Sequence, residues 1–253
     1  MGKVSHSKEQ FVHGVFESIA HKYDQMNNLL SFRRHKAWRK VAMKKMKVRE
    51  NDTALDVCSG TCDWAISLAQ ASKGGRVVAL DFSKKMLEVG AKKVSARGLD
   101  KQIQLIEGNA MKLPFADNTF DHVTIGFALR NVPDYRHVLK EMTRVVKPGG
   151  QVVSLELSKP TWAPFRRIYY FYFQRILPWL GKIFANRYEQ YRWLPESLVH
   201  FPDYRELKRI MEEEVGLIQV EAIPLTGGIA ALHIGRKEAK GAKMKKDDDH
   251  ASD

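Results

Sequence analysis

Three short polar segments could together hold a nucleoside, and each of them follows an apolar run. The first is the turn from Asp56 to Asp63, where small residues let backbone N–H groups approach a ligand at a helix N-terminus. Asp81 ends the second run, and its carboxylate could accept hydrogen bonds from both hydroxyls of a ribose. Asn109 and Ala110 follow the third run, where a side-chain amide and a backbone N–H could read the edge of an adenine.

The glycine content of the first turn indicates which kind of nucleoside compound binds. Dinucleotide sites use the pattern G-x-G-x-x-G to cradle a pyrophosphate, whereas this turn has only Gly60 in that window. The order D-x-x-x-G-T, acid, N-A resembles the class I methyltransferases, whose cofactor S-adenosylmethionine has no pyrophosphate. The resemblance implies cofactor contacts at Gly60, Thr61, Asp81, Asn109 and Ala110. The alternative is that Asp56 and Asp81 only cap helices.

The elements that must position these residues alternate along the chain from residue 53 onward. Short apolar runs predict strands at Thr53–Cys58, Arg76–Leu80, Ile103–Glu107, His122–Ile125 and Gln151–Glu156. Amphipathic stretches predict helices at Trp64–Ala71, Ser83–Ala96, Tyr135–Val146 and Tyr204–Glu214. Strands that alternate with helices imply βαβ units and a parallel sheet. The predicted fold class is α/β, a Rossmann-like doubly wound sheet of seven strands, as in class I methyltransferases.

Glycine and proline predict the turns in the second half of the chain. Lys147-Pro148-Gly149-Gly150 should stop a helix and form a turn. Ile218–Ile223 and Ile229–Gly235 should be two closing strands, joined through Pro224 and the Gly227-Gly228 pair.

The chain divides by pattern into three parts. Residues 1–50 have helical periodicity and are expected to form a helical N-terminal lid. Residues 51–236 are expected to form the methyltransferase domain, with an aromatic helical insertion at about 160–202. Residues 237–253 carry runs of Lys and Asp without apolar periodicity, which is typical of a disordered tail.

Composition excludes several other kinds of protein. The chain has 253 residues, 44% of them hydrophobic, which suits one large domain. It has no apolar run of about 18 residues and no apolar signal segment at its start, so a cytoplasmic location is expected. Two thiols, Cys58 and Cys62, without further ligands at suitable spacing do not make a metal site. We therefore expect no bound metal.

The net charge of +13 is concentrated in two segments. Residues 1–50 carry twelve Lys and Arg against four Asp and Glu, and residues 160–210 carry nine against four. Such patches favour a nucleic acid, an anionic membrane surface or an acidic ligand, although basic surfaces also serve solubility.

Six segments extend the resemblance from the fold to one family. They are residues 15–27, 29–39, 129–132, 144–150, 155–160 and 226–233. Among them, Y-D-x-M-N and L-R-N-V resemble the demethylmenaquinone and ubiquinone-precursor C-methyltransferases, and the resemblance covers roughly residues 11–237. It implies methylation of a polyprenylated quinol ring, foremost demethylmenaquinol to menaquinol, and a homodimer. A ubiquinone precursor, a nucleic acid or another small molecule are the alternative substrates. Cys62 departs from the family, which usually has Gly there, and would be strained at a positive φ.

Carbon methylation of a quinol needs loss of a phenolic proton, because a neutral ring carbon is a poor nucleophile. The resemblance assigns Arg130 and Asn131 to the ring oxygen, and the charge of Arg130 would favour the phenolate. Tyr23 and Asp24 in the lid are the next candidates, with Asp24 as a proton acceptor or relay. The alternatives are a structural salt bridge for Arg130 and a capping or filling role for Tyr23 and Asp24. His233 is interpreted as a packed strand histidine.

The residue types of the insertion indicate how the protein reaches such a lipid substrate. Residues 162–173 are densely aromatic and include Arg166 and Arg167, a combination typical of membrane interfaces and of single-stranded nucleic-acid sites. The sequence Gly126-Phe127-Ala128-Leu129 stands where many base N-methyltransferases have N/D-P-P-Y/F, which counts against nucleic acid. The expected partner is a transient membrane surface, at the inner face of the cytoplasmic membrane.

Overall fold

The protein is described by a computed structural model, which covers residues 2–160, 167, 171 and 197–239, with side chains from residue 10 onward. Most of the predicted aromatic insertion and residues 240–253 of the predicted tail lie outside the described residues.

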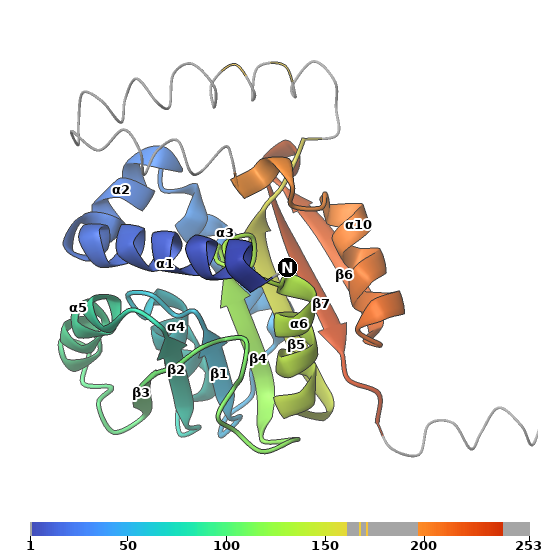
Figure 1. Cartoon of the computed structure of the whole chain (residues 1–253). Coiled ribbons are helices and arrows are strands. Elements are labelled where there is room, and N and C mark those ends of the chain that lie inside the picture. The colour runs from blue at the N-terminus through green and yellow to red at the C-terminus, as the bar shows by residue number, and fades with distance from the viewer. Residues whose placement is uncertain (1, 161–166, 168–170, 172–196, 240–253) are drawn as a thin grey trace, which may run out of the picture.

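The centre of the molecule is a seven-stranded sheet in the order β3-β2-β1-β4-β5-β7-β6 (Figure 1). The strands are β1 (Ala54–Val57), β2 (Val77–Asp81), β3 (Ile103–Glu107), β4 (Phe120–Gly126), β5 (Val146–Leu157), β6 (Ile218–Leu225) and β7 (Ala230–Arg236). The first five strands pair in parallel, whereas β7 is antiparallel to both β5 and β6. The predicted α/β fold class with seven strands is confirmed.

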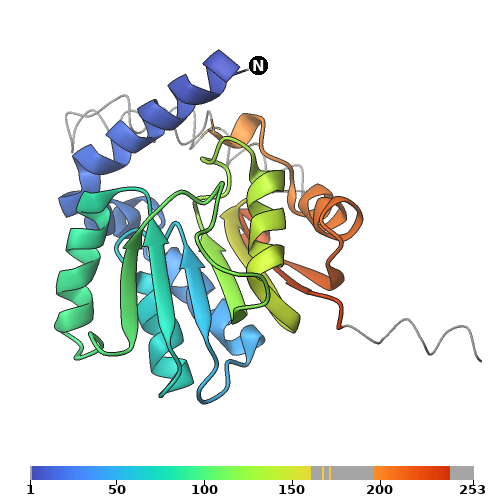
Figure 2. The ribbon, with the colours of Figure 1, turned by 60° about the horizontal axis from the view of Figure 1, so that its bottom comes forward.

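Helices cover both faces of this sheet (Figure 2). They are α4 (Asp63–Ser72), α5 (Lys84–Ser95), α6 (Tyr135–Val145) and α10 (Tyr204–Arg209). Because side chains alternate along a strand, Val153 of β5 belongs to the apolar cluster on the face of α4 and α5, whereas its neighbour Val152 belongs to the cluster on the face of α6 and α10. The two apolar clusters hold the strands rigid, so the carboxyl ends of β1, β2 and β4 stay together.

The predicted joint at Pro224 is wrong. Pro224 lies inside β6, where it pairs with Ala231 of β7. Proline is tolerated there because β6 is an edge strand, whose outer backbone groups have no partner strand and so need no N–H. The turn is made by η4 (Thr226–Gly228) alone, in which Gly227 and Gly228 both have positive φ.

Two further boundaries differ from the prediction. The helix does stop at Val145, but residues 147–150 form an irregular start to β5 instead of a free turn, with the register to β4 shifting there. Backbone hydrogen bonds between Gly149, Gly150 and Lys237 hold it in place. The predicted helix 204–214 changes after α10 into one π-helical stretch, η3 (Ile210–Glu214).

The lid, residues 1–50, contains α1 (Gly2–Ile19), η1 (Ala20–Lys22), α2 (Tyr23–Leu30) and α3 (Arg34–Met46). Helix α1 crosses above the edge where the parallel strands end (Figure 2). Helix α3 instead packs on the sheet, with Trp38, Ala42 and Met46 buried in the core. The indole N–H of Trp38 also donates to Thr226 Oγ1 at 2.8 Å. One part of the lid is therefore fixed to the core and another part stands over the strand ends. No helix in the described part of the chain has the length and apolar character to cross a membrane.

Candidate active site

The turn after β1 has an unusual backbone. Cys58, Gly60 and Cys62 all have positive φ, at 54°, 55° and 62°. Glycine adopts this conformation freely, whereas each cysteine is strained by roughly 1–2 kcal/mol. The strain expected at Cys62 is thus present. Its thiol is accommodated because Gly90 of α5 lies opposite, where a Cβ atom would overlap the sulfur.

Hydrogen bonds to the Asp56 carboxylate hold this turn in place. Its carboxylate accepts hydrogen bonds from Ser59 Oγ at 2.7 Å, Thr124 Oγ1 at 2.8 Å and the backbone N–H of Ala65 at 3.1 Å. The last bond caps α4, so the capping interpretation holds for Asp56. Burial raises the pKa of Asp56 to about 6, although these hydrogen bonds act in the opposite direction.

Asp81, at the end of β2, combines a structural contact with access to a cavity. Its carboxylate accepts the N–H of Gly60 at 2.8 Å and that of Ser83 at 2.9 Å. Burial raises its pKa to about 6, against the effect of these backbone bonds. A carboxylate has about four acceptor positions, so the site keeps capacity for the hydroxyls of a ribose.

Two neighbouring cavities open above the strand ends. The smaller, about 60 Å³, is lined by Asp81, Asn109 and Ala110. The larger, about 550 Å³, is lined mainly by the lid, the turn after β1 and the end of β4. Residues shared by both walls are Phe16, Tyr23, Cys58, Gly60, Gly126, Phe127 and Asn131. The predicted cofactor residues Asp81, Asn109 and Ala110 therefore meet at one cavity, and Gly60 joins it to the other.

The four predicted catalytic residues all line the larger cavity, and Tyr23 and Asn131 also line the smaller one. Burial raises the pKa of the Tyr23 phenol, although the Asn27 side chain and the charge of Arg130 lower it. Tyr23 thus keeps its proton at neutral pH. Asn131 is buried and donates from Nδ2 to the Phe127 carbonyl at 3.5 Å. Both side chains stand where the two cavities meet.

Arg130 forms a buried ion pair, so the salt bridge expected as the alternative role of this residue is present. Its Nη1 donates to Glu156 Oε1 at 2.5 Å and to the Phe127 carbonyl at 2.6 Å, and its Nε donates to Ser197 Oγ at 3.2 Å. The Arg130 and Glu156 side chains are only 8% and 2% exposed. Arg130 also lines the larger cavity, and no described residue accepts a hydrogen bond from its Nη2.

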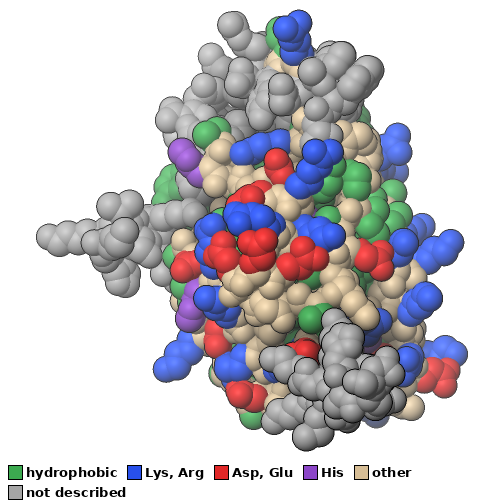
Figure 3. Space-filling model, turned by 90° about the vertical axis from the view of Figure 1, so that its right-hand side faces the viewer, with side chains coloured by type: hydrophobic (Ala, Val, Ile, Leu, Met, Phe, Trp, Pro, Cys, Tyr) green, Lys and Arg blue, Asp and Glu red, His purple; other side chains and the backbone are tan. Residues whose placement is uncertain are grey.

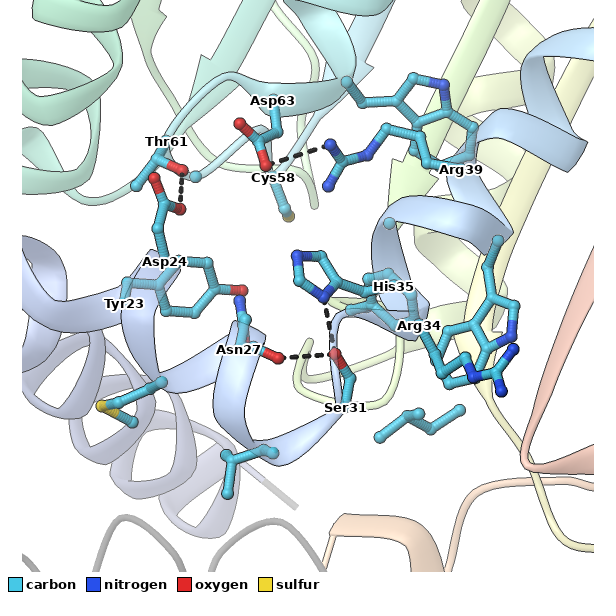
Figure 4. Close-up of a pocket in the computed structure, with 18 of the residues that line it drawn as sticks. Tyr23, Asp24, Asn27, Ser31, Arg34, His35, Arg39, Cys58, Thr61 and Asp63 are labelled. Atoms are coloured by element: carbon cyan, nitrogen blue, oxygen red, sulfur yellow. Dashed lines mark hydrogen bonds and ion pairs between the residues drawn. The ribbon is translucent and has the colours of Figure 1, made fainter. Parts of the chain in front are cut away.

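Asp24 belongs to a network that ties the lid to the turn after β1 (Figure 4). Thr61 Oγ1 donates to Asp24 Oδ1 at 2.7 Å, and Lys93 Nζ lies 2.7 Å from Asp24 Oδ2 and 2.5 Å from Asp63. Arg39 lies 3.0 Å from Asp63 on the other side. Burial alone would raise the pKa of Asp63, but Arg39 and Lys93 outweigh it and lower the pKa. We call these five side chains the lid network. Both carboxylate oxygens of Asp24 are engaged in it, and Thr61 acts here through its side chain.

Sequence reasoning missed three residues of the site. Glu156 ends the apolar core of β5, beside β4, and the rule that ligands bind at strand ends could have identified it. His35 stood in a segment carrying the resemblance but received no role. Lys93 gave no signal, because its partners Asp24, Asp63 and Thr61 lie on other elements. His233 is confirmed as a packed histidine: it is 1% exposed, and its Nε2 lies 2.8 Å from the Tyr204 carbonyl.

Known proteins share both the sequence and the fold. Residues 4–237 match the family described as the ubiE/COQ5 methyltransferase family. A demethylmenaquinone methyltransferase of Bacillus cytotoxicus is 58% identical over 232 residues, which are 91% of this chain and 97% of that protein.

Solved structures confirm the fold at low sequence identity. A SAM-dependent methyltransferase from Aquifex aeolicus aligns with a TM-score of 0.57 at 20% identity, covering 78% of this chain and 88% of that one. A methyltransferase described as S-adenosylmethionine-dependent from Methanococcus maripaludis aligns with a TM-score of 0.61 at 19% identity, covering 89% and 95%. The match across nearly the whole described chain, on this fold, means that the protein belongs to the ubiE/COQ5 methyltransferase family and is an S-adenosylmethionine-dependent methyltransferase.

Proposed function

We propose that the protein methylates a ring carbon of demethylmenaquinol to give menaquinol. The observation that carries the proposal is that the cavity holding Asp81, Asn109 and Ala110 meets a larger cavity at Tyr23 and Asn131. The 58% identity to a demethylmenaquinone methyltransferase supports this choice of quinol. A ubiquinone precursor is the alternative substrate, since it is also a hydroquinone with a polyprenyl tail.

Four residues are proposed to hold S-adenosylmethionine, which supplies an activated methyl group when bound. Asp81 would accept the ribose hydroxyls, and Asn109 with Ala110 would contact the adenine. Gly60 adopts its positive φ freely and has no side chain, so the backbone there can approach the ligand. An added Cβ would also come within 3.3 Å of Met86 Cε. Thr61, also predicted to contact the cofactor, is proposed to act by holding the turn against Asp24.

The larger cavity is proposed to hold the quinol ring near the transferable methyl group. Arg130 would donate from Nη2 to a ring oxygen, where its charge stabilises negative charge that develops during the reaction. The fixed pair with Glu156 keeps the guanidinium in one orientation, which lowers the entropic cost of alignment. Asn131 and Tyr23 would complete the polar end. Asp24 is proposed to hold the lid closed, since both its oxygens already have partners.

The mouth of the larger cavity suits a lipid substrate. Phe32 lines this cavity and is 71% exposed, and Leu29 beside it is 44% exposed. Arg33 and Arg34 follow directly and are also exposed. Aromatic and basic side chains together favour an anionic membrane surface. We propose that the protein binds transiently, through this mouth, to the inner face of the cytoplasmic membrane, where the polyprenyl tail resides.

The opposite side of the molecule has a different character. Around α10, exposed charges of both signs alternate (Figure 3). Arg209 pairs there with Glu206 and Glu213, and Arg136 with Glu214. Paired charges neutralise each other, so these described residues around α10 form no basic patch for a membrane. The proposed orientation therefore places the mouth toward the lipid and α10 away from it. The homodimer stays a prediction from the family.

The function is tested with reduced demethylmenaquinone in detergent and methyl-labelled S-adenosylmethionine, followed by mass analysis of the quinone. The expected product carries one labelled methyl group on the ring. The ubiquinone precursor is assayed in parallel, and faster turnover of it would replace menaquinone by ubiquinone in the proposal. Protein that binds the cofactor yet methylates neither quinol would refute it.

Membrane binding is tested by sedimentation with vesicles of anionic or zwitterionic phospholipids. Binding to anionic vesicles should weaken in Phe32→Ser. The matched control is Ile218→Ser, because Ile218 is an exposed apolar residue on the edge strand β6. Equal binding by both variants, or equal binding to both vesicle types, would count against this orientation.

A further inference from the structure

His35 lies in the wall of the larger cavity and has no part in the mechanism described so far. It is the second residue of α3 and only 7% exposed. Its Nδ1 lies 2.6 Å from Ser31 Oγ, and the same hydroxyl lies 2.6 Å from the carbonyl oxygen of Asn27. The orientation of the imidazole ring is therefore set by helix α3, which carries it, and by the hydrogen bond at Nδ1.

These two contacts decide which ring nitrogen carries the proton. A carbonyl oxygen only accepts hydrogen bonds, so the single proton of the Ser31 hydroxyl is directed to Asn27. Ser31 must then accept from His35, which places the proton of the neutral ring on Nδ1. Nε2 is left with its lone pair, and it points into the cavity toward Tyr23 and Cys58 (Figure 4). In the described part of the chain no group donates a hydrogen bond to it.

Burial, assisted by two neighbouring cations, keeps this imidazole neutral. Burial lowers the pKa of His35 to about 4, and Arg39 and Lys36 on the same helix act in the same direction. Asp63 of α4 and Asp24 of α2 raise the pKa and so act against them. At neutral pH the ring is therefore a proton acceptor. The two carboxylates would stabilise the imidazolium formed when it accepts a proton.

We propose that His35 accepts, at Nε2, the proton of the quinol hydroxyl next to the ring carbon that is methylated. The inference rests on the proposed function. As the ring carbon bonds to the methyl group, the carbon–sulfur bond breaks and its electrons stay on sulfur. The O–H bond electrons form the ring carbonyl while the proton moves to His35. Water then removes the hydrogen on the methylated carbon, and His35 returns its proton to the oxygen. The aromatic quinol is restored, and one proton is released overall.

A weak base suits this step. A resting phenol has a pKa of about 10, so His35 cannot ionise it before the reaction begins. During attack, however, the ring loses electron density to the new bond and its O–H group becomes strongly acidic. A neutral imidazole can accept the proton at that stage, and positioned bases contribute roughly 10²–10⁴-fold to rate.

The first test compares His35→Asn with wild type in the full-length protein. The amide of asparagine can still donate to Ser31, but it cannot accept a proton as imidazole does. We expect kcat to fall roughly 10²- to 10⁴-fold, with the dissociation constant for S-adenosylmethionine and the KM for demethylmenaquinol little changed. His21→Asn, at an exposed histidine of η1, is the matched control and should keep wild-type activity.

The outcomes separate this inference from the proposed function. If the wild-type protein methylates no quinol, the proposed function itself is refuted. An active wild type with His35→Asn within about threefold of its kcat overturns the role of His35 alone, since that loss is far below the range for a positioned base.

A rescue experiment covers the case in which His35→Asn is poorly folded. His35→Ala is assayed with added imidazole, and separately with pyrazole, which has the same shape but is a far weaker base. Added imidazole should raise the turnover rate of His35→Ala at least about tenfold, whereas pyrazole should raise it little. Equal restoration by the two would mean that the ring only fills space, and no restoration by imidazole would likewise overturn proton transfer at this position.

Discussion

The two cavities meet at Tyr23 and Asn131, yet they are built by different parts of the fold. The smaller cavity is lined mainly by strand ends and the loops that follow them, including Gly60, whose N–H donates to Asp81. Only its upper wall comes from Val12, Phe16 and Tyr23 of the lid. The larger cavity is lined by side chains of the lid together with the buried pair of Arg130 and Glu156. The first arrangement depends on sheet geometry, which many methyltransferases share. The second depends on contacts between side chains of several elements, and function is carried by such a site and not by the fold alone.

The largest expected effect tests the larger cavity. Glu156→Ala leaves the charge of Arg130 buried without its partner, so the free energy of unfolding should fall by about 3–5 kcal/mol. Turnover should be lost as well, because the guanidinium loses its orientation. Urea denaturation measures the first effect, and Glu50→Ala, in the exposed pair with Lys73, should leave stability unchanged. Comparable stability of both variants would show that the pair contributes little.

The next effect concerns pH and Asp56. Its folded pKa of about 6 exceeds its ordinary value of 3.8, so the folded state binds more protons between these values. Stability from this group is therefore fully present below pH 4 and lost as pH rises through about 6. The shift corresponds to about 3 kcal/mol. Relative to Asp56→Asn, wild type should lose about 2 kcal/mol of this stability from pH 4 to pH 6.5, as measured by urea denaturation at each pH.

Asp121 is the control for this pH dependence. Its pKa is lowered, because hydrogen bonds from Lys147 and Thr53 outweigh its burial. Its contribution is present above its unfolded pKa and lost only as pH falls through the lower folded value. Wild type relative to Asp121→Asn should thus show no loss between pH 4 and pH 6.5. A flat difference for Asp56 as well would contradict the raised pKa.

A third prediction separates two buried carboxylates, Asp81 in the wall of the smaller cavity and Asp56 in the wall of the larger one. Asp81→Asn should weaken S-adenosylmethionine binding by roughly 10- to 100-fold, because hydrogen bonds to a charged acceptor are worth about 1.5–3 kcal/mol. Asp56→Asn should leave affinity nearly unchanged, since its carboxylate contacts only the protein. Titration calorimetry measures both. Equal losses of affinity would remove the distinction drawn between a capping and a binding carboxylate.

The fourth prediction addresses the strained turn. Gly90→Ala should destabilise the protein by about 1–3 kcal/mol, because the added methyl group overlaps the Cys62 sulfur. In a Cys62→Gly background the same substitution should cost much less, since the sulfur is gone and alanine favours the helix. A double-mutant cycle of unfolding free energies isolates the contact. Additive effects would show that α5 shifts to accommodate the methyl group.

The smallest expected effect concerns the lid network. Lys93→Met removes the ammonium group that joins Asp24 to Asp63. The KM for S-adenosylmethionine should rise several-fold, on the order of 1 kcal/mol for a partly exposed pair. Amide hydrogens of α2 should exchange faster in this variant, as measured by mass spectrometry. Lys92→Met, on the exposed face of the same helix, should change neither quantity.

The sequence by itself determined the elements and the smaller cavity. Apolar periodicity located every strand of the sheet, and parallel strands necessarily bring Gly60, Asp81 and Asn109 to one edge. The family resemblance also indicated the strain at Cys62, because this residue stands where the family usually has glycine. The sequence pattern misplaced Pro224, since its assignment to a turn ignored that an edge strand tolerates proline.

The larger cavity was decided only by the tertiary structure. Asp24 and Lys93 are 69 positions apart, and Arg130 and Glu156 are 26 apart. No local pattern predicts such partners, because they depend on how α2 and α5, or β4 and β5, pack in space. The same holds for His35, whose free nitrogen is defined by Ser31 and by the cavity it faces. Backbone periodicity encodes where elements lie, whereas the partners of long polar side chains follow from packing between elements.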